Sequence, residues 1–193
     1  MGVVGGLYAN AFVADLVTTM DEQRRVLHHF LAALAYRAQK ALRDAPGDFG
    51  SFQAGKGVRT PAGLVRHMTS VLGYARTFFV GGTYRPDPLP SLQEEIARFH
   101  EMVQDLARHV RAGTPLLEGM TLERLLQGPF SDAMTHVGQL AMLRRLAGVP
   151  VAPENFVFAE ISTERLGPDQ AEPARPDSIW PEAPAGWMPP PSN

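Results

Sequence analysis

Three ionisable side chains in this sequence have the type and spacing of metal ligands. Asp132 and His136 are four residues apart in PFSDAMTHVGQLAMLRRLAGVP, residues 129–150, where apolar residues recur at helical spacing. Both fall on the apolar face of that helix, and residues four apart are neighbours, so both could reach one ion. His67 lies among the apolar positions of an earlier helix and could supply a third ligand. The pattern predicts a divalent metal site shared by two helices.

The same residues also allow an interpretation without a metal. A buried histidine is often only hydrogen-bonded within the core, and Asp132 with His136 could satisfy each other and bind nothing. Gln139, three residues after His136, could hydrogen-bond a ligand or a bound substrate, or it could face solvent. Residue spacing alone leaves both interpretations open.

Two segments of the chain resemble one known superfamily. The segments RTPAGLVRHM, residues 59–68, and DAMTHVGQLAMLRRLAGVP, residues 132–150, are similar to the DinB/YfiT-like four-helix bundles, which include bacillithiol S-transferases and mycothiol-dependent maleylpyruvate isomerase. The resemblance implies a divalent ion bound by one histidine of the second helix and two residues four apart on the last, here His67, Asp132 and His136. Most members have histidine where this chain has Asp132, although the carboxylate resembles the Glu-x-x-x-His pair of the mycothiol-dependent enzymes.

This resemblance implies a metal-dependent transferase that activates a low-molecular-weight thiol for attack on an electrophilic small molecule. We expect zinc or nickel as the ion. The chain contains no cysteine, so the thiol must belong to a substrate. The alternatives are a metal-dependent hydrolase and a non-catalytic bundle that a metal stabilises. The sequence identifies no general base, so the catalytic residues are unknown from sequence alone.

The amino-acid composition argues against nucleic acids and membranes as partners. The 193 residues carry a net charge of −2, which predicts no basic surface for nucleic acid or for an anionic membrane. The first residues lack a basic segment, and Asn10 and Asp15 interrupt their apolar run, so we expect no signal peptide. No apolar stretch has the length of a membrane span. We therefore expect a cytoplasmic protein.

Four apolar stripes at helical spacing indicate the scaffold for the site. The first covers about residues 9–42, the second begins at Pro61, the third begins after Ser91, and the last follows a kink at Gly128-Pro129. Loops rich in glycine and proline separate them. The sequence predicts an all-α protein with a DinB-like four-helix bundle over residues 1–164.

Histidines outside the candidate site are expected to lie at the surface or at the edge of the core. His28 and His29 are consecutive and diverge by about 100°, so they cannot both face the core. His100 and His109 lie off the apolar stripe of the third helix, which predicts solvent exposure. We expect His100 and His109 not to bind the metal, and the alternative for His28 and His29 is a place in a substrate pocket.

The composition changes after residue 164. Residues 165–193 hold eight of the 17 prolines, so we expect an extended C-terminal arm there instead of a helix. Trp180 and Trp187 are the only tryptophans of the chain. We expect them to anchor this arm on the bundle or on a second subunit of a homodimer.

Overall fold

The computed structural model describes residues 5–173, 179–181, 183, 185–186 and 188, with side chains from residue 22 onwards. The elements in chain order are α1 (Gly5–Leu42), η1 (Phe49–Ser51), α2 (Pro61–Val80), α3 (Leu92–Arg111), α4 (Leu122–Leu125), the π-helical turn η2 (Leu126–Phe130), α5 (Ser131–Leu146) and η3 (Phe156–Phe158). The predicted all-α fold is confirmed. Among the described residues, none of these helices combines the length and apolar character that crossing a membrane requires.

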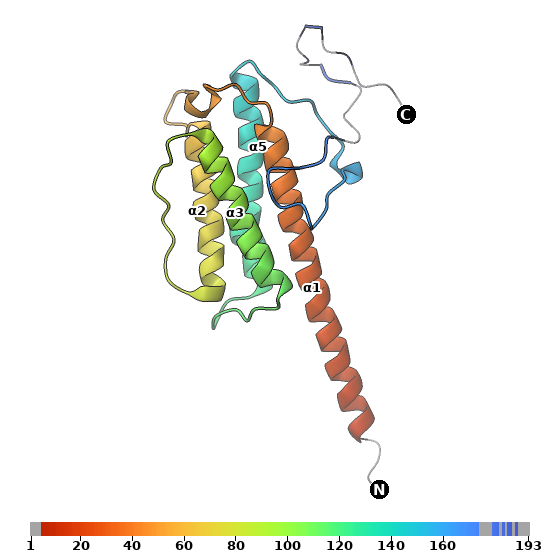
Figure 1. The fold of residues 1–193 in the computed structure, drawn as a ribbon. Coiled ribbons are helices and arrows are strands. Elements are labelled where there is room, and N and C mark those ends of the chain that lie inside the picture. Colours follow the sequence, from red (N-terminus) through yellow and green to blue (C-terminus); the bar gives the residue numbers. More distant parts are fainter. Residues whose placement is uncertain (1–4, 174–178, 182, 184, 187, 189–193) are drawn as a thin grey trace.

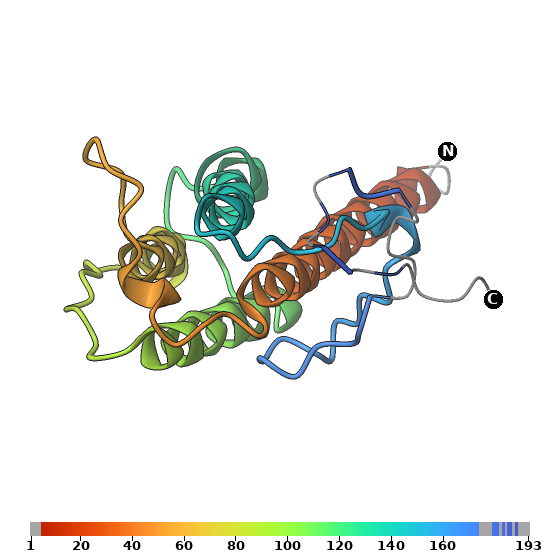
Figure 2. The ribbon, with the colours of Figure 1, turned by 90° about the horizontal axis from the view of Figure 1, so that it is seen from above.

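The four long helices form a bundle around one core. α2 packs against α3 and α5, and α1 packs against the same two helices, so α1 and α2 lie at opposite corners (Figure 1, Figure 2). The largest fully buried side chains are Tyr36, Phe49, Phe99, Phe130, Leu31, Leu34, Met68, Leu72, Leu106, Leu125, Leu140 and Leu143. The two helices that carry the candidate ligands, α2 and α5, therefore lie side by side.

Local hydrogen bonds start α2 and α3 where the sequence predicts. Thr60 Oγ1 accepts a hydrogen bond from the Gly63 amide at 3.2 Å, and Pro61 occupies the first helical position. Ser91 and Glu94 form a capping box, with Glu94 N donating to Ser91 Oγ at 3.2 Å and Ser91 N donating to Glu94 Oε2 at 3.0 Å. These bonds satisfy amides that have no partner in the first helical turn.

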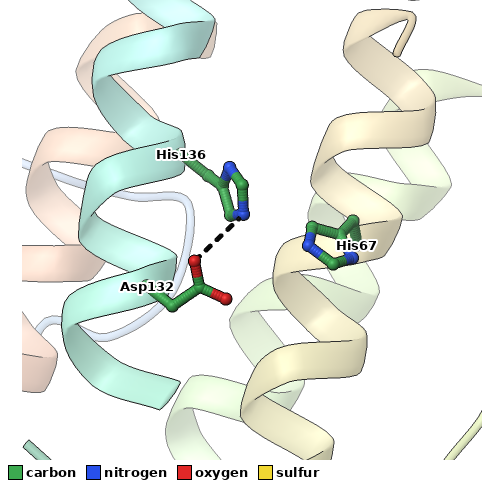
Figure 3. A group of neighbouring side chains, drawn as sticks. All are labelled: His67, Asp132 and His136. Carbon is green, nitrogen blue, oxygen red and sulfur yellow. Dashed lines mark ion pairs between the residues drawn. The ribbon is translucent and has the colours of Figure 1, made fainter. Parts of the chain in front are cut away.

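A kink at Gly128 separates α4 from α5. Gly128 has φ −97° and ψ −105°, which is not helical, and Pro129 follows it within η2. Phe130 is fully buried, and its ring stacks on that of Phe30 with the centroids 6.1 Å apart. The predicted kink is confirmed. With Phe130 held in the core, the first turn of α5 presents Asp132 toward α2 (Figure 3).

The first part of α1 runs beyond the ends of α2, α3 and α5 (Figure 1). Arg24 donates to the carbonyl oxygens of Val110 at 3.4 Å and Thr114 at 3.2 Å, at the C-terminal end of α3. Leu27 is the first residue of α1 with a described side chain that is buried. The helix therefore enters the bundle near Arg24 and leaves residues 5–21 projecting from it.

The chain after α5 returns across α1. Arg43, which follows the last residue of α1, donates a hydrogen bond to the carbonyl oxygen of Gln170 at 2.8 Å. Trp180 is buried, whereas Trp187 lies outside the described residues. The division of the chain into a bundle and a C-terminal arm after residue 164 stays a prediction.

His100 is buried, contrary to the sequence-based expectation. The residue is 1% exposed, and its ring places Nδ1 2.8 Å from the Leu166 carbonyl oxygen and Nε2 3.3 Å from Gln39 Oε1. The prediction was wrong because the segment that covers His100 is distant in sequence and leaves no trace in the periodicity of α3. His28 is partly buried and His29 is exposed, as expected.

Candidate metal centre

His67, Asp132 and His136 come together between α2 and α5. His67 lies in the second turn of α2, and the other two occupy successive turns at the start of α5. Their side chains face the space between the two helices (Figure 3). One ligand atom from each residue lies within 4.8 Å of those of the other two, so the group could hold a metal ion. All three ligands predicted from the sequence are present in it.

Asp132 and His136 have the spacing of two ligands of one ion. The distance from His136 Nε2 to Asp132 Oδ1 is 3.3 Å. Two donors bound at the usual distances to a tetrahedral ion are about 3.4 Å apart. The His67 ring faces that of His136, with centroids 4.7 Å apart and planes inclined by 72°. The ligand atoms of the three residues lie within 4.8 Å of one another, so an inward shift of His67 by at most about 1.4 Å would bring all three donors to ligand spacing.

Gln139 fixes which nitrogen of His136 is available as a ligand. Its Oε1 lies 2.9 Å from His136 Nδ1 and is only an acceptor, so Nδ1 carries the proton. Nε2 is then the ring nitrogen that faces the Asp132 carboxylate, whose oxygens are acceptors. Two acceptors at 3.3 Å repel each other unless a cation, either a proton or a metal ion, lies between them. Gln139 therefore contacts a candidate ligand, and its side chain is exposed.

The surroundings keep His67 in the form that binds metals. Burial lowers the pKa of His67, Arg59 and His136 lower it further, and Asp132 raises it. His67 is therefore neutral at neutral pH and presents a lone pair. The His136 side chain is 10% exposed and that of Asp132 is 50% exposed. Within this group the His136 imidazole is therefore almost entirely buried, whereas the Asp132 carboxylate is accessible to solvent.

A cleft of about 640 Å³ opens beside Asp132. It is lined by Ser70, Val71, Tyr74, Gln127, Gly128, Pro129, Ser131, Asp132 and Thr135. Asp132 is the one carboxylic side chain among these residues. The volume lies within the range of small-molecule sites. One of the three candidate ligands therefore borders a space that could receive a small molecule.

No family model, curated protein or solved structure matches this chain. What the site does must therefore be inferred from its residues and their arrangement.

Of the cleft residues, sequence reasoning identified only Asp132 as functional. Ser70 and Tyr74 follow His67 by three and seven residues, which is the spacing of one helix face, so a signal for them was present in the sequence. Gln127 and Gly128 reach the cleft through the kink before α5. Helical spacing does not indicate the direction of a kinked segment, so it could not identify Gln127 and Gly128 as cleft residues.

Proposed function

We propose that this chain is a metal-dependent transferase similar to the DinB/YfiT-like bundles, with zinc or nickel held by His67, Asp132 and His136. Its reaction is the transfer of a low-molecular-weight thiol to an electrophilic small molecule. The proposal is supported by the resemblance of residues 59–68 and 132–150, and by a donor set of two imidazoles and one carboxylate, which suits both metals.

One observation favours catalysis over a structural metal. A structural ion is usually enclosed by four protein ligands, whereas a catalytic ion has three and keeps a position open. The candidate group contains three ligands and borders a cleft of about 640 Å³ through Asp132. This arrangement favours a transferase over the non-catalytic bundle.

The chemistry divides between the ion and the chain. A divalent ion bound by these residues would supply a Lewis acid that lowers the pKa of a thiol. In the transfer itself, the thiol gives its proton to solvent and its sulfur attacks the electrophilic carbon. A C–S bond forms, and the displaced electron pair leaves with a leaving group or moves along an activated double bond that is then protonated.

The chain's own residues orient the site and form the cleft. Gln139 holds His136 with Nε2 directed toward Asp132. Asp132 places a negative charge at the edge of the cleft, which disfavours anionic groups close to it. Val71 and Tyr74 provide an apolar wall on the α2 side, against which the electrophile can lie.

Metal analysis tests the ligand assignment. The wild-type chain should bind one equivalent of zinc or nickel in competition with a chelating dye, and the triple variant His67→Ala/Asp132→Ala/His136→Ala should not. His29→Ala, which removes an exposed histidine outside the group, is the matched control and should bind like the wild type. Equal and negligible metal content in all three proteins would end the proposal.

An activity screen tests the reaction. The metal-loaded protein should consume bacillithiol, mycothiol or glutathione in the presence of simple electrophiles, and the triple alanine variant should not. Ester or amide turnover without any thiol would instead support the hydrolase. A protein that binds metal but shows neither activity would support the non-catalytic bundle.

A further inference from the structure

Arg59 places a positive charge beside the candidate metal centre. It precedes Thr60, the N-cap of α2, and is exposed. Its side chain makes no hydrogen bond or ion pair within the part of the chain that the structure describes. The guanidinium is nevertheless close enough to His67 to lower the pKa of that imidazole. Its charge is therefore available to a molecule bound at the centre.

The α2 face that carries His67 runs from Arg59 to the cleft. A Cβ added to Gly63 would lie 4.0 Å from Arg59 Cβ, so the arginine stem lies beside the first turn of α2. Gly63 precedes His67 by four residues, which places it on the same helix face and about 6 Å away along the axis. The cleft residues of α2 continue this face in the other direction. The candidate centre therefore lies between Arg59 and the cleft.

The two sides of the centre carry opposite charges. On the cleft side, Asp132 is a carboxylate, and none of the residues that line the cleft is cationic. On the other side, Arg59 provides a guanidinium. An anionic group on a bound molecule is attracted to Arg59 and repelled from the cleft side. The charges therefore orient such a molecule, with its anionic group directed away from the cleft.

We propose that Arg59 makes the site specific for a thiol that carries a carboxylate, with the carboxylate at Arg59 and the sulfur at the ion. This inference rests on the function proposed above, because it names the class of thiol used in that reaction. Arginine suits the task, since its planar guanidinium can donate two parallel hydrogen bonds to one carboxylate. The cleft then stays open for the electrophile, which approaches the sulfur from the side of Val71 and Tyr74.

Thiol binding to the cobalt-loaded full chain tests this inference without any turnover. The ligand-field absorption of Co²⁺ reports metal occupancy, and the thiolate-to-cobalt charge-transfer band reports bound thiol. Mercaptopropionate and its neutral amide, mercaptopropionamide, differ only in the carboxylate. Arg59→Ala should weaken binding of mercaptopropionate by about threefold to fivefold at low salt, the effect of an exposed ion pair, and leave binding of the amide unchanged.

Two further variants separate a role of the guanidinium from a change in net charge. Arg59→Lys keeps the positive charge and should retain part of the affinity for mercaptopropionate. Arg85→Ala removes an exposed arginine from the loop after α2 and is the matched control. It should bind both thiols like the wild type. Added salt should reduce the difference between the wild type and Arg59→Ala, because it screens exposed charges.

The outcomes distinguish failure of this inference from failure of the proposed function. If both thiols bind and Arg59→Ala leaves the affinity for mercaptopropionate unchanged, the role of Arg59 is overturned and the transferase still stands. An equal loss of both thiols in Arg59→Ala would overturn the role as well, because the effect would not depend on the carboxylate. A cobalt-loaded wild type that binds neither thiol would overturn this inference together with the transferase.

Discussion

Replacing Gln139 by alanine should weaken metal binding about tenfold, even though this side chain touches no metal. The 2.9 Å bond to His136 Nδ1 would be lost, and a net side-chain hydrogen bond is worth about 1 kcal/mol, or roughly fivefold in affinity. Without it the two neutral tautomers of His136 become similar in energy, and only one presents Nε2, which adds a factor of about two. Because Gln139 is exposed, water can replace part of the bond, so the loss of affinity lies at the lower end of the range for residues that hydrogen-bond a metal ligand.

Competition titration against a chelator of known affinity measures this change directly. Gln139→Glu should bind the metal at least as tightly as the wild type, because a carboxylate is a stronger acceptor for Nδ1–H. Gly138→Ala serves as the control beside it, since this glycine is exposed and an added Cβ would meet nothing within 4 Å. Its affinity should not change.

Two results would refute the tautomer argument. Wild-type affinity in Gln139→Ala would mean that Gln139 does not hold the His136 ring. Weaker binding in Gln139→Glu than in Gln139→Ala would mean that Nδ1 does not carry the proton. Either result would also remove the reason for expecting a cation between His136 Nε2 and Asp132.

Three further outcomes follow from the structure. Gly73→Ala should lower the free energy of unfolding by about 1–3 kcal/mol in urea titrations, because the new Cβ would lie 1.9 Å from the Tyr84 ring; an unchanged urea midpoint would contradict that packing. Burial lowers the pKa of His100, so the folded state binds its proton less readily than the unfolded chain; this contribution to stability is full above about pH 6.5 and is lost as pH falls toward the folded-state pKa. His100→Gln should therefore flatten the fall in melting temperature below that pH, and an identical pH profile would refute this account. Chelation of the metal-loaded protein should lower its melting temperature without abolishing the helical circular dichroism signal, because four helices already supply a core; complete loss of helix at room temperature would contradict this.

The parts of the site that are local in sequence could be predicted, and those that depend on distant segments could not. Asp132 and His136 are one helical turn apart, so any α-helix brings them together, and His67 needed only the expectation that its helix packs on the last one. The cleft depends on the backbone at Gly128, where the sequence indicates a kink but not its direction. His100 was misplaced for a related reason, because the carbonyl oxygen of Leu166 that accepts its hydrogen bond lies 66 residues away along the chain.

The role of a glycine inside a helix also depends on contacts with other segments, which the local sequence does not show. Gly73 and Gly138 both sit inside helices, where glycine is unfavourable, and nothing in the local sequence distinguishes them. In the structure, Tyr84 from the loop after α2 lies against Gly73, whereas Gly138 faces open space. Gly73 therefore has a packing role that alanine cannot fill, and Gly138 has none in the described part of the chain.

The ligands on α2 and α5 are separated by about 65 residues of chain, a length that includes all of α3 and the kinked turn. An ion bound by His67, Asp132 and His136 would therefore close a long covalent loop in the way that a disulfide does. By the relation used for disulfides, a loop of this size restricts the unfolded chain by about 4 kcal/mol. The ion would link α2 to α5, the two helices that line the cleft. Amide hydrogen exchange in α2 and α5 should then slow together on metal binding, and the cleft would keep its width while substrates enter and leave.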